Sequence, residues 1–321
     1  MLCMKKYFSI IVTVLLAVGC SRPIENVDFR QEMRDFVVEI SRTARQQNPD
    51  FMVIPQNGLE LIATGQEADG TLATDYLDAI DGHGQEELFY GYKRDNVATP
   101  EDVTNYWLEY LHRSQLYGKT ILSIDYCTSA DHVADAQQRN DAEHFVSFVA
   151  PHRELDVIPD GPISHENNQD ILKLSDAQNF LYLINPQNFS TKQAFIQAVC
   201  ATNYDLLVMD LFLDEDAFTA EEVEQLHHKA NGGRRLVICY LSIGEAENYR
   251  YYWDPSWRTH KPEWLERANP RWPGNYKVRY WHPDWQNIIC GPGDSYLNRI
   301  LTAHFDGVYL DLVDAFQYFE N

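Results

Sequence analysis

Short apolar runs alternate with segments of helical periodicity along most of the chain. The pattern predicts nine strands, at residues 51–55, 88–90, 120–126, 145–149, 180–184, 206–210, 236–242, 277–281 and 305–312. The runs at 88–90 and 277–281 are the weakest. Strands that alternate with helices predict a parallel sheet with helices on its outer face, so we expect an α/β fold. A single (β/α)8 TIM barrel, which takes ~250 residues or more, fits the length of the chain.

The order of elements at the two ends differs from that of an ordinary barrel. Residues 28–47 have the periodicity of an amphipathic helix, but no strand is predicted before them. The strand at 305–312 is followed by no predicted helix. Every strand of a closed βα barrel needs a helix over its outer face. We therefore expect the N-terminal helix to cover the C-terminal strand, so that the two ends meet and the barrel is opened at an unusual place.

Residues 151–179 differ in composition from the rest of the chain. They contain three prolines, Gly161 and paired asparagines at 167 and 168, and few apolar residues recur at any period. Such a composition is typical of a loop or linker. The segment separates the chain into two halves that both alternate strands and helices.

The first 19 residues have the pattern of a signal segment. Lys5 and Lys6 precede an apolar run, which is too short for a comfortable membrane span, and Gly19 precedes Cys20. The sequence before Cys20 resembles a lipobox, which would place a lipid on Cys20 after cleavage and leave residues 20–27 as a tether. The alternative is an ordinary secretory signal with an unrelated cysteine. We expect an exported lipoprotein, anchored to a membrane at the cell surface or in the periplasm.

The chain is strongly acidic. Its formal net charge of −22 becomes −24 once Lys5 and Lys6 leave with the signal segment. This charge argues against nucleic acid or an anionic membrane surface as a partner, because both attract basic patches. It suits a cationic partner, and solubility alone is an equally good explanation.

The five cysteines after residue 19 form no CxxC pair and no zinc-like spacing with histidine. Cys239 lies inside an apolar run and is predicted to be a small core residue. A disulfide among Cys127, Cys200 and Cys290 stays open at this point.

Carboxylates gather at the ends of the predicted strands, where βα barrels carry their active sites. The set has two functional interpretations: metal binding, or general acid and base catalysis by a pair of carboxyl groups at a glycosidic bond. The structural alternative is helix capping and loop hydrogen bonding. The residues at or just after strand ends are Asp125, Asp210, Glu245, Glu247, Asp311 and Asp314, and Glu86 and Glu87 directly precede the predicted strand at 88–90.

Aromatic residues concentrate between positions 249 and 285, where five tyrosines accompany six of the seven tryptophans. Flat aromatic faces bind the C–H faces of sugars and also hold cations. The alternative is that a long loop needs large side chains to pack itself over the sheet. The tryptophans are Trp253, Trp257, Trp264, Trp272, Trp281 and Trp285.

Several motifs make the chain similar to a known family. Residues 240–247 (YLSIGEAE), 249–253 (YRYYW), 269–276 (NPRWPGNY) and 305–311 (FDGVYLD) resemble glycoside hydrolase family 114. That family contains endo-α-1,4-polygalactosaminidases and many uncharacterised barrel proteins. Three motifs of the first half resemble the bacterial branch of the family, namely 54–58 (IPQNG), 84–91 (GQEELFYG) and 122–126 (LSIDY).

In that branch the motifs of the first half normally follow the strand that ends in Gly-Val-Tyr-Leu-Asp, whereas here they precede it. The resemblance therefore implies one circularly permuted barrel domain at 28–321. Residues 28–150 would be the second half of the usual order, 151–179 would join the usual termini, and 180–321 would be the first half. Natural termini often lie close together at the surface, which makes such a join feasible.

The resemblance also implies roles for individual residues. Asp311 and Glu86, with Glu87 as fallback, would be the catalytic carboxylates. One acid would protonate the leaving oxygen while the other acts as nucleophile or activates water. Asp125, Asp210 and Glu245 would hold sugar amines or hydroxyls or tune the catalytic pair. Further substrate-binding residues would be Asn57, Tyr240, Tyr309, Trp253, Trp272 and Trp281.

We therefore expect a surface-tethered glycosidase without cofactor or metal. Its substrate would be an amino-sugar polysaccharide similar to α-1,4-polygalactosamine, which is cationic when its amines are free. One alternative is a carbohydrate-binding lipoprotein that has kept the barrel and lost catalysis. A metal-dependent hydrolase is a weaker alternative, since only His83 and His282 lie near suitable loops.

Overall fold

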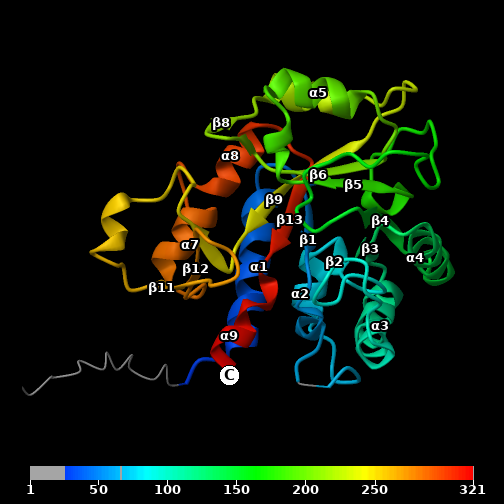
Figure 1. Ribbon diagram of the computed structural model, residues 1–321. Coiled ribbons are helices and arrows are strands. Elements are labelled where there is room, and N and C mark those ends of the chain that lie inside the picture. Colours follow the sequence, from blue (N-terminus) through cyan, green and yellow to red (C-terminus); the bar gives the residue numbers. More distant parts are fainter. Residues whose placement is uncertain (1–25, 66, 321) are drawn as a thin grey trace, which may run out of the picture.

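The computed structural model describes residues 26–65 and 67–320 (Figure 1). The predicted signal segment and Cys20 lie outside these residues. Within the described residues, no helix is long and apolar enough to cross a membrane. The chain forms a mixed α/β structure in which strands from distant parts of the sequence lie side by side.

Five parallel strands form the larger sheet. In spatial order they are β1 (Met52–Pro55), β13 (Gly307–Asp311), β9 (Leu236–Ser242), β6 (Leu206–Met209) and β5 (Phe180–Leu183). The last strand of the sequence thus lies between β1 and β9, and both of these strands pair with it in parallel. Nearly all residues of these strands are buried, as expected of a parallel sheet that is covered on both faces.

Three more parallel strands form a second sheet next to the first. They are β2 (Gly82–Glu86), β3 (Thr120–Tyr126) and β4 (Val146–Ala150). At one edge β2 lies beside β1, because the backbone N–H of Asn57 donates to the carbonyl of Gly84 at 2.8 Å. At the other edge β4 approaches β5, where the ring centroids of Phe148 and Phe180 are 5.6 Å apart.

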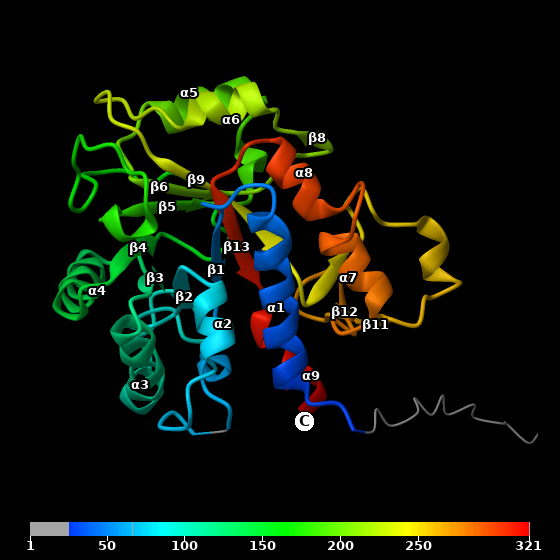
Figure 2. The same cartoon turned by 180° about the vertical axis from the view of Figure 1, so that it is seen from behind.

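Helices lie around the outside of these strands in both views (Figures 1 and 2). The α-helices are α1 (Phe29–Arg45), α2 (Thr74–Ala79), α3 (Glu101–Leu116), α4 (Ala130–Glu143), α5 (Lys192–Cys200), α6 (Ala220–Leu226), α7 (Pro283–Cys290), α8 (Tyr296–Thr302) and α9 (Gln317–Glu320). The 3-10 turns are η1 (Leu59–Ile62), η2 (Leu174–Asp176), η3 (Pro186–Asn188), η4 (Pro255–Arg258) and η5 (Val313–Phe316). The local sequence explains the starts of the helices: α6 begins with a capping box between Thr219 and Glu222.

The N-terminal helix docks against the end of the chain, as the order of predicted elements requires. Helix α1 contacts α2 on one side and α7 and α8 on the other, and it also contacts η5. The guanidinium of Arg30 forms an ion pair with Glu320 at 2.9 Å. Figure 2 shows the start of α1 next to the C-terminal helix. The chain after β13 forms η5 and the short helix α9, which the sequence pattern did not predict, and α1 packs beside them.

Two of the nine predicted strands do not belong to the two parallel sheets. Residues 88–90 belong to a loop, because β2 ends at Glu86 and Glu87 turns the chain with a positive φ of 58°. The run at 277–281 overlaps β12 (Asn275–Val278), which pairs antiparallel with β10 (Glu245–Glu247) and β11 (Leu265–Ala268) in a small separate sheet. A two-stranded ribbon of β7 (Phe212–Leu213) and β8 (Asp216–Ala217) follows β6.

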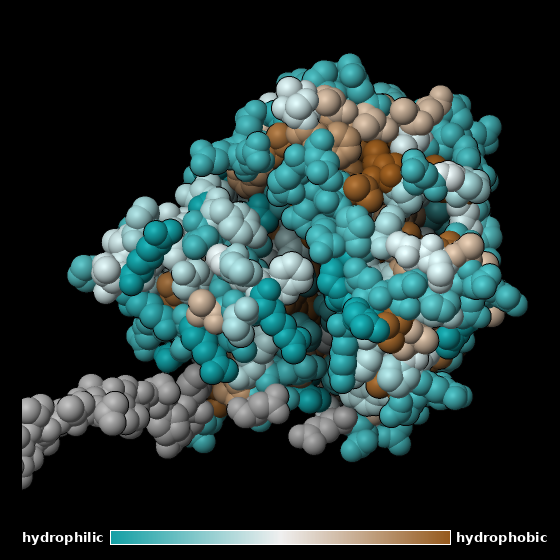
Figure 3. Space-filling model, in the orientation of Figure 1, coloured by the Kyte–Doolittle hydropathy of each residue, from teal (hydrophilic) through white to brown (hydrophobic). Residues whose placement is uncertain are grey.

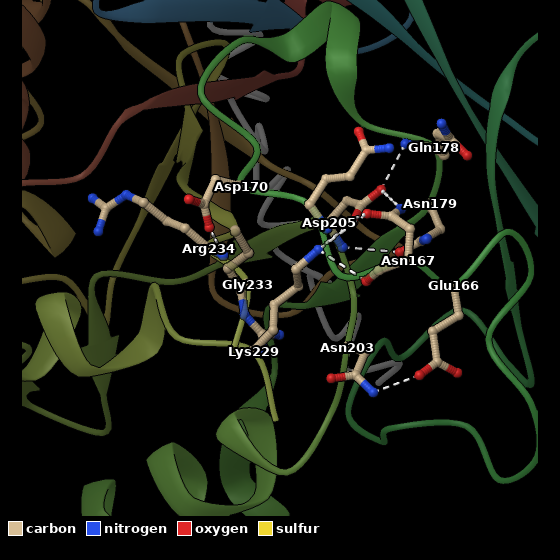
Figure 4. A network of polar contacts seen from close by, with 12 residues as sticks. Glu166, Asn167, Asp170, Gln178, Asn179, Asn203, Asp205, Lys229, Gly233 and Arg234 are labelled. Atoms are coloured by element: carbon tan, nitrogen blue, oxygen red, sulfur yellow. Dashed lines mark hydrogen bonds and ion pairs between the residues drawn. The ribbon is translucent and has the colours of Figure 1, made fainter. Parts of the chain in front are cut away.

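The segment 151–179 is irregular, as predicted, but it is firmly attached to the rest of the molecule. Figure 4 shows the polar network that holds it. Asp205 and Lys229 form a completely buried ion pair at 2.9 Å. The side-chain amide of Asn167 and the backbone N–H of Gln178 donate to the same carboxylate at 2.8 and 2.9 Å. The segment is therefore part of the folded structure and differs from a loose linker.

The cysteines of the described residues are all free thiols, so the disulfide that the sequence left open is absent among them. Cys239 is fully buried in β9, in agreement with the predicted core position.

Candidate active site

A cleft of about 280 Å³ opens at the carboxyl ends of the parallel strands. On the face shown in Figure 3, hydrophilic side chains border a central hollow. Residues from both halves of the chain line the cleft, because β2 and β13 end at the same side of the molecule. The predicted site residues that line it are Asn57, Glu86, Asp210, Tyr240, Glu245, Trp272 and Asp311.

The side-chain amide of Gln56 bridges the two predicted catalytic acids. Its Nε2 donates to Glu86 Oε2 at 2.8 Å and to Asp311 Oδ1 at 3.1 Å. The hydroxyl of Tyr182 donates to Gln56 Oε1 at 3.0 Å, which fixes the orientation of the amide. Since Glu86 Oε2 and Asp311 Oδ1 both contact this nitrogen, these two oxygens lie at most about 6 Å apart, a range that includes the ~5–5.5 Å that separates the acids of retaining glycosidases.

Asp311 is held by donors on three sides. The hydroxyl of Tyr240 donates to its Oδ2 at 2.5 Å, and the backbone N–H of Leu312 donates to its Oδ1 at 2.7 Å. Burial raises the pKa of Asp311, while these hydrogen bonds and the one from Gln56 act in the opposite direction. The donors favour the ionised carboxylate and point its oxygens into the cleft.

Glu86 ends β2 on the other side of the amide bridge. The hydroxyl of Tyr126 donates to its Oε1, and the amide of Asn57 donates to its Oε2 at 3.2 Å. Burial and the nearby charge of Asp311 raise the pKa of Glu86 to about 7. A pKa raised in this way keeps a carboxyl group protonated to higher pH, which is the property that a general acid needs.

Asp314 is a third carboxyl group in the cleft, to which the sequence assigned no role beyond its place after the last strand. It lines the cleft from η5. Burial, together with the charge of Asp311, raises its pKa to about 7. Its position could have been inferred, since it lies three residues beyond Asp311 in the turn that follows β13.

Asp210 lies in the cleft wall, but its negative charge is paired with a cation of the protein. The guanidinium of Arg250 donates to its two oxygens at 2.8 and 2.7 Å in a bidentate pair, and it also binds Glu247. The side chains of Arg250 and Asp210 are 7% and 8% exposed. Arg250 was missed as a site residue, although it belongs to the motif at 249–253.

Glu245 lines the cleft although it is fully buried. Its Oε1 accepts hydrogen bonds from the Asn269 amide at 2.9 Å and from the Tyr318 hydroxyl at 3.3 Å, and its Oε2 has no hydrogen-bond partner among the described residues. Burial raises its pKa. Trp272 lies at the rim with 53% of its surface exposed, so its ring is open to a ligand.

Asp125 does not reach the cleft, and its predicted contact with substrate is replaced by a structural role. It is fully buried. Its Oδ1 accepts the backbone N–H groups of Phe89 and Tyr90 at 2.7 and 2.8 Å, and its Oδ2 accepts the amide of Asn140 at 3.0 Å. Asp125 thus shapes the loop that follows Glu86, which explains why an acid is needed at the end of β3.

Three predicted aromatic residues also lie outside the cleft. Tyr309 is completely buried beneath it, and a Cβ placed on Gly84 would be only 1.8 Å from its hydroxyl oxygen. Trp281 packs between Phe29 and Phe319 and so connects the two ends of the chain. Trp253 lines an adjoining pocket that shares Tyr249 and Arg250 with the cleft.

Glu87, the predicted fallback, is turned away from Asp311 by its left-handed backbone. It forms an ion pair with Arg153 at 2.8 Å and lies outside the lining of the cleft. Glu86 is therefore the residue of this pair that faces Asp311. Among the described residues, no group of three or more His, Cys, Asp and Glu side chains is placed to hold a metal ion.

The model of glycoside hydrolase family GH114 matches residues 161–321. This range begins inside the irregular segment and covers half of the chain.

Three uncharacterised proteins are similar to parts of the chain. The protein from Methanocaldococcus jannaschii is 42% identical over 156 residues, which are 48% of this chain and 41% of the relative. Those from Deinococcus radiodurans and Thermotoga maritima are 41% and 37% identical over 40% and 37% of this chain. The chain therefore spans about two fifths of the length of these relatives.

One solved structure, Aspergillus fumigatus Ega3 in complex with galactosamine, matches with a TM-score of 0.28 and 21% sequence identity. The match covers 50% of this chain and 49% of that one.

Proposed function

The chain belongs to glycoside hydrolase family GH114, and from this we propose that its cleft hydrolyses glycosidic bonds in a polysaccharide. The observation that carries the proposal is the pair of carboxyl groups on one amide bridge. Glu86 and Asp311 come from opposite halves of the chain, and Gln56 holds both at the cleft. Two carboxyl groups at this spacing are the machinery that glycoside hydrolysis needs.

Glu86 is the proposed acid and Asp311 the proposed nucleophile. Glu86 transfers its proton to the leaving glycosidic oxygen while an oxygen of Asp311 bonds to the anomeric carbon and the old C–O bond breaks. Water then attacks the same carbon, Glu86 takes up its proton, and the bond to Asp311 breaks. This assignment follows the raised pKa of Glu86 and the donors around Asp311.

The spacing of the acids supports retention of configuration. An inverting enzyme leaves ~6.5–9.5 Å between its carboxyl groups to admit a water molecule. The shared contacts with Gln56 hold the nearest oxygens closer than this. The first product formed should therefore have the anomeric configuration of the substrate, which NMR during early turnover tests directly.

The proposed substrate is a polysaccharide with free amines, similar to α-1,4-polygalactosamine. The strong negative charge of the chain attracts a cationic polymer, and Asp314 and Glu245 place further carboxyl groups at the cleft. Such attraction weakens with salt, because the Debye length falls from ~30 Å at 0.01 M to ~10 Å at 0.1 M. Hydrolysis should therefore slow over this range; an equal or faster rate would argue against a charge-driven substrate.

The eight parallel strands are proposed to form one TIM barrel in circularly permuted order. The contacts of β1 with β2 and of β4 with β5 support a continuous ring of strands. The docking of α1 beside the last strand supports the exchange of halves. The start of the family match within the segment 151–179 also agrees with a join at that place.

Export and lipid attachment at Cys20 complete the proposal and would place the enzyme at a membrane surface. These residues lie outside the described part of the chain, so only their sequence pattern supports the idea. In cells that carry out lipoprotein processing, metabolic labelling with a fatty acid should mark the full chain and leave a Cys20→Ser variant unmarked. Labelling of both or of neither would contradict lipidation at this cysteine.

The decisive experiment incubates the purified protein with polygalactosamine and separates the products by chromatography. Asp311→Asn and Glu86→Gln should each lower kcat by about 10²- to 10⁴-fold, the usual contribution of such groups. Glu266→Gln is the matched control, because Glu266 is ion-paired with Arg279 and lies outside the lining of the cleft. Full activity in Asp311→Asn would refute the assignment, and binding without cleavage by the unmodified protein would indicate a carbohydrate-binding protein instead.

A further inference from the structure

Arg153 lines the cleft from the irregular segment 151–179, to which the family resemblance gave only the role of joining the usual termini. Its guanidinium makes three kinds of contact. Nη1 pairs with Glu87 at 2.8 Å, Nε pairs with Asp95 at 2.8 Å, and Nη2 donates to the carbonyl of Gly91 at 2.7 Å. The side chain is 29% exposed and lines the cleft. These bonds fix the position of its charge.

The same guanidinium lies over the ring of Tyr126, with its carbon 5.0 Å from the ring centroid. Gly91 also lies against this ring, since a Cβ at that position would be 2.9 Å from it. Arg153 and the backbone of Gly91 therefore both lie against the ring of Tyr126 and are hydrogen-bonded to each other. A cation over the face of a phenol also withdraws electron density from it, which makes the hydroxyl a stronger donor. That hydroxyl donates to Glu86.

Arg153 also neutralises the carboxylate next to the proposed acid. Glu87 follows Glu86 directly, and its left-handed backbone, with φ of 58°, turns its side chain toward Arg153. Without this cation, the free charge of Glu87 would act on Glu86 from one residue away and favour its protonated form. Both effects of Arg153 therefore stabilise the ionised form of Glu86.

We propose that Arg153 is a positioning residue that sets the protonation equilibrium of Glu86 through Tyr126 and Glu87. The proposal rests on the proposed function, in which Glu86 is the acid. It implies that the segment 151–179 contributes to catalysis as well as connecting the two halves of the chain.

Titratable groups from several elements act on Glu86, and Arg153 acts through two of them, Tyr126 and Glu87. They come from the loop after β2 and from β3, β5, β13 and η5, and their side chains all remain present when only Arg153 is replaced. The groups are Glu87, Tyr126, Tyr182, Tyr309, Asp311 and Asp314.

The experiment compares the pH dependence of kcat/KM for the unmodified protein, Arg153→Met and Arg153→Lys on polygalactosamine. Loss of the cation should raise the pKa of Glu86, so the acid stays protonated to higher pH. The descending limb of the profile should therefore move upward by about 0.5–1 pH unit in Arg153→Met. Arg153→Lys keeps the charge and should restore most of the original position.

Arg279→Met is the matched control for the loss of an arginine. Arg279 is 24% exposed and ion-paired with Glu266, and it lies outside the lining of the cleft. Its variant should keep the original pH profile. A profile for Arg153→Met that coincides with that of the unmodified protein would overturn the proposal, as would an equal shift in Arg279→Met.

A second measurement separates the positioning role from the proposed function. Side-chain ¹³C NMR of glutamate-labelled protein follows the titration of Glu86 directly, with the signal identified by its loss in Glu86→Gln. The midpoint should rise in Arg153→Met whether or not the protein cleaves polygalactosamine. A raised midpoint without hydrolysis would support the positioning role and refute the proposed function, and an unchanged midpoint would refute the positioning role.

Discussion

Gln56 is the residue on which the relative position of Glu86 and Asp311 depends. A carboxamide has two N–H donors, and here each donates to a different carboxylate while the oxygen accepts from Tyr182. The reversed amide would place its oxygen against both acids and its donors against a hydroxyl, so only one orientation satisfies all three partners. This single side chain therefore defines the distance between Glu86 and Asp311.

Glu86 should make the protein less stable as the pH rises. Its folded pKa of about 7 lies above the ordinary value of 4.5, so its contribution to stability is fully present below about pH 4.5 and is lost as pH rises through 7. Gln has no charge to bury. The free energy of unfolding of Glu86→Gln relative to the unmodified protein should therefore increase by about 1–3 kcal/mol between pH 4.5 and pH 8.

Urea unfolding at a series of pH values measures this difference. The free energy of unfolding of Asp314→Asn relative to the unmodified protein should also increase over this pH range, because the pKa of Asp314 is also raised to about 7. If the unfolding free energies of the unmodified protein and Glu86→Gln ran parallel over the whole pH range, folding would not raise the pKa of Glu86, and the prediction would be wrong.

Among the elements, the irregular segment 151–179 depends on one buried ion pair for its attachment. Lys229 lies in the turn after α6 and Asp205 lies just before β6, and both side chains are completely inaccessible. The ammonium also donates to the carbonyl of Asn167 at 3.2 Å, so the pair and the segment share one network (Figure 4). A buried pair of this kind is costly to break because the remaining charge is left without a partner.

Lys229→Met should therefore lower the free energy of unfolding by about 3–5 kcal/mol, measured by urea denaturation. The double variant Lys229→Met with Asp205→Asn should lose less unfolding free energy than Lys229→Met alone, since no unpaired buried charge remains. Lys173→Met changes an exposed lysine of the same segment and should stay within about 0.5 kcal/mol of the unmodified protein. Equal stability of Lys229→Met and the unmodified protein would mean that the network does not anchor the segment.

At the scale of the whole molecule, the two ends of the described chain meet on one side. Arg30 binds Glu320, and Trp281 packs against Phe29 and Phe319 from both ends. Three different parts of the sequence therefore form one small cluster. This proximity is what a circular permutation requires, because the same fold can then be cut elsewhere and joined here.

A chain that begins at Gly161, joins Glu320 to Asp28 through a Gly/Ser linker of about eight residues and ends at Asp160 should fold to the same structure. The new cut lies in an exposed part of the segment and leaves Arg153 and Asn167 in place. Its melting temperature should stay within a few degrees of that of the unmodified protein, and its hydrolytic activity should be kept.

Cutting instead between Val208 and Met209 is the matched control, because it interrupts strand β6, which pairs with both β5 and β9, and should prevent folding. Failure of the Gly161 chain to fold would contradict the proposed permutation, as would equal folding of both chains.

The sequence by itself determined the element types and the residues at the strand ends. Alternating apolar runs and capping signals depend on a few neighbouring residues, and so the strands around Asp210, Ser242 and Asp311 could be located in the sequence. The order of the predicted elements also led us to expect the helix at 28–47 beside the strand at 305–312, and the structure places α1 against η5, which follows β13. The family resemblance paired Glu86 with Asp311, whereas the pattern placed Glu86 before the predicted strand at 88–90, and only the structure shows that Glu86 ends β2.

The tertiary structure alone decided which side chains face the cleft. Asp125 and Asp311 both end or nearly end buried strands, but one is enclosed by backbone N–H groups and the other by Tyr240 and Gln56. Trp272 is exposed while Trp281 is packed between the chain ends. Local periodicity reports which face of an element is apolar, whereas these differences depend on partners far away in the sequence. Only the folded arrangement brings such partners within hydrogen-bond or van der Waals distance, and no local pattern encodes which of them will meet.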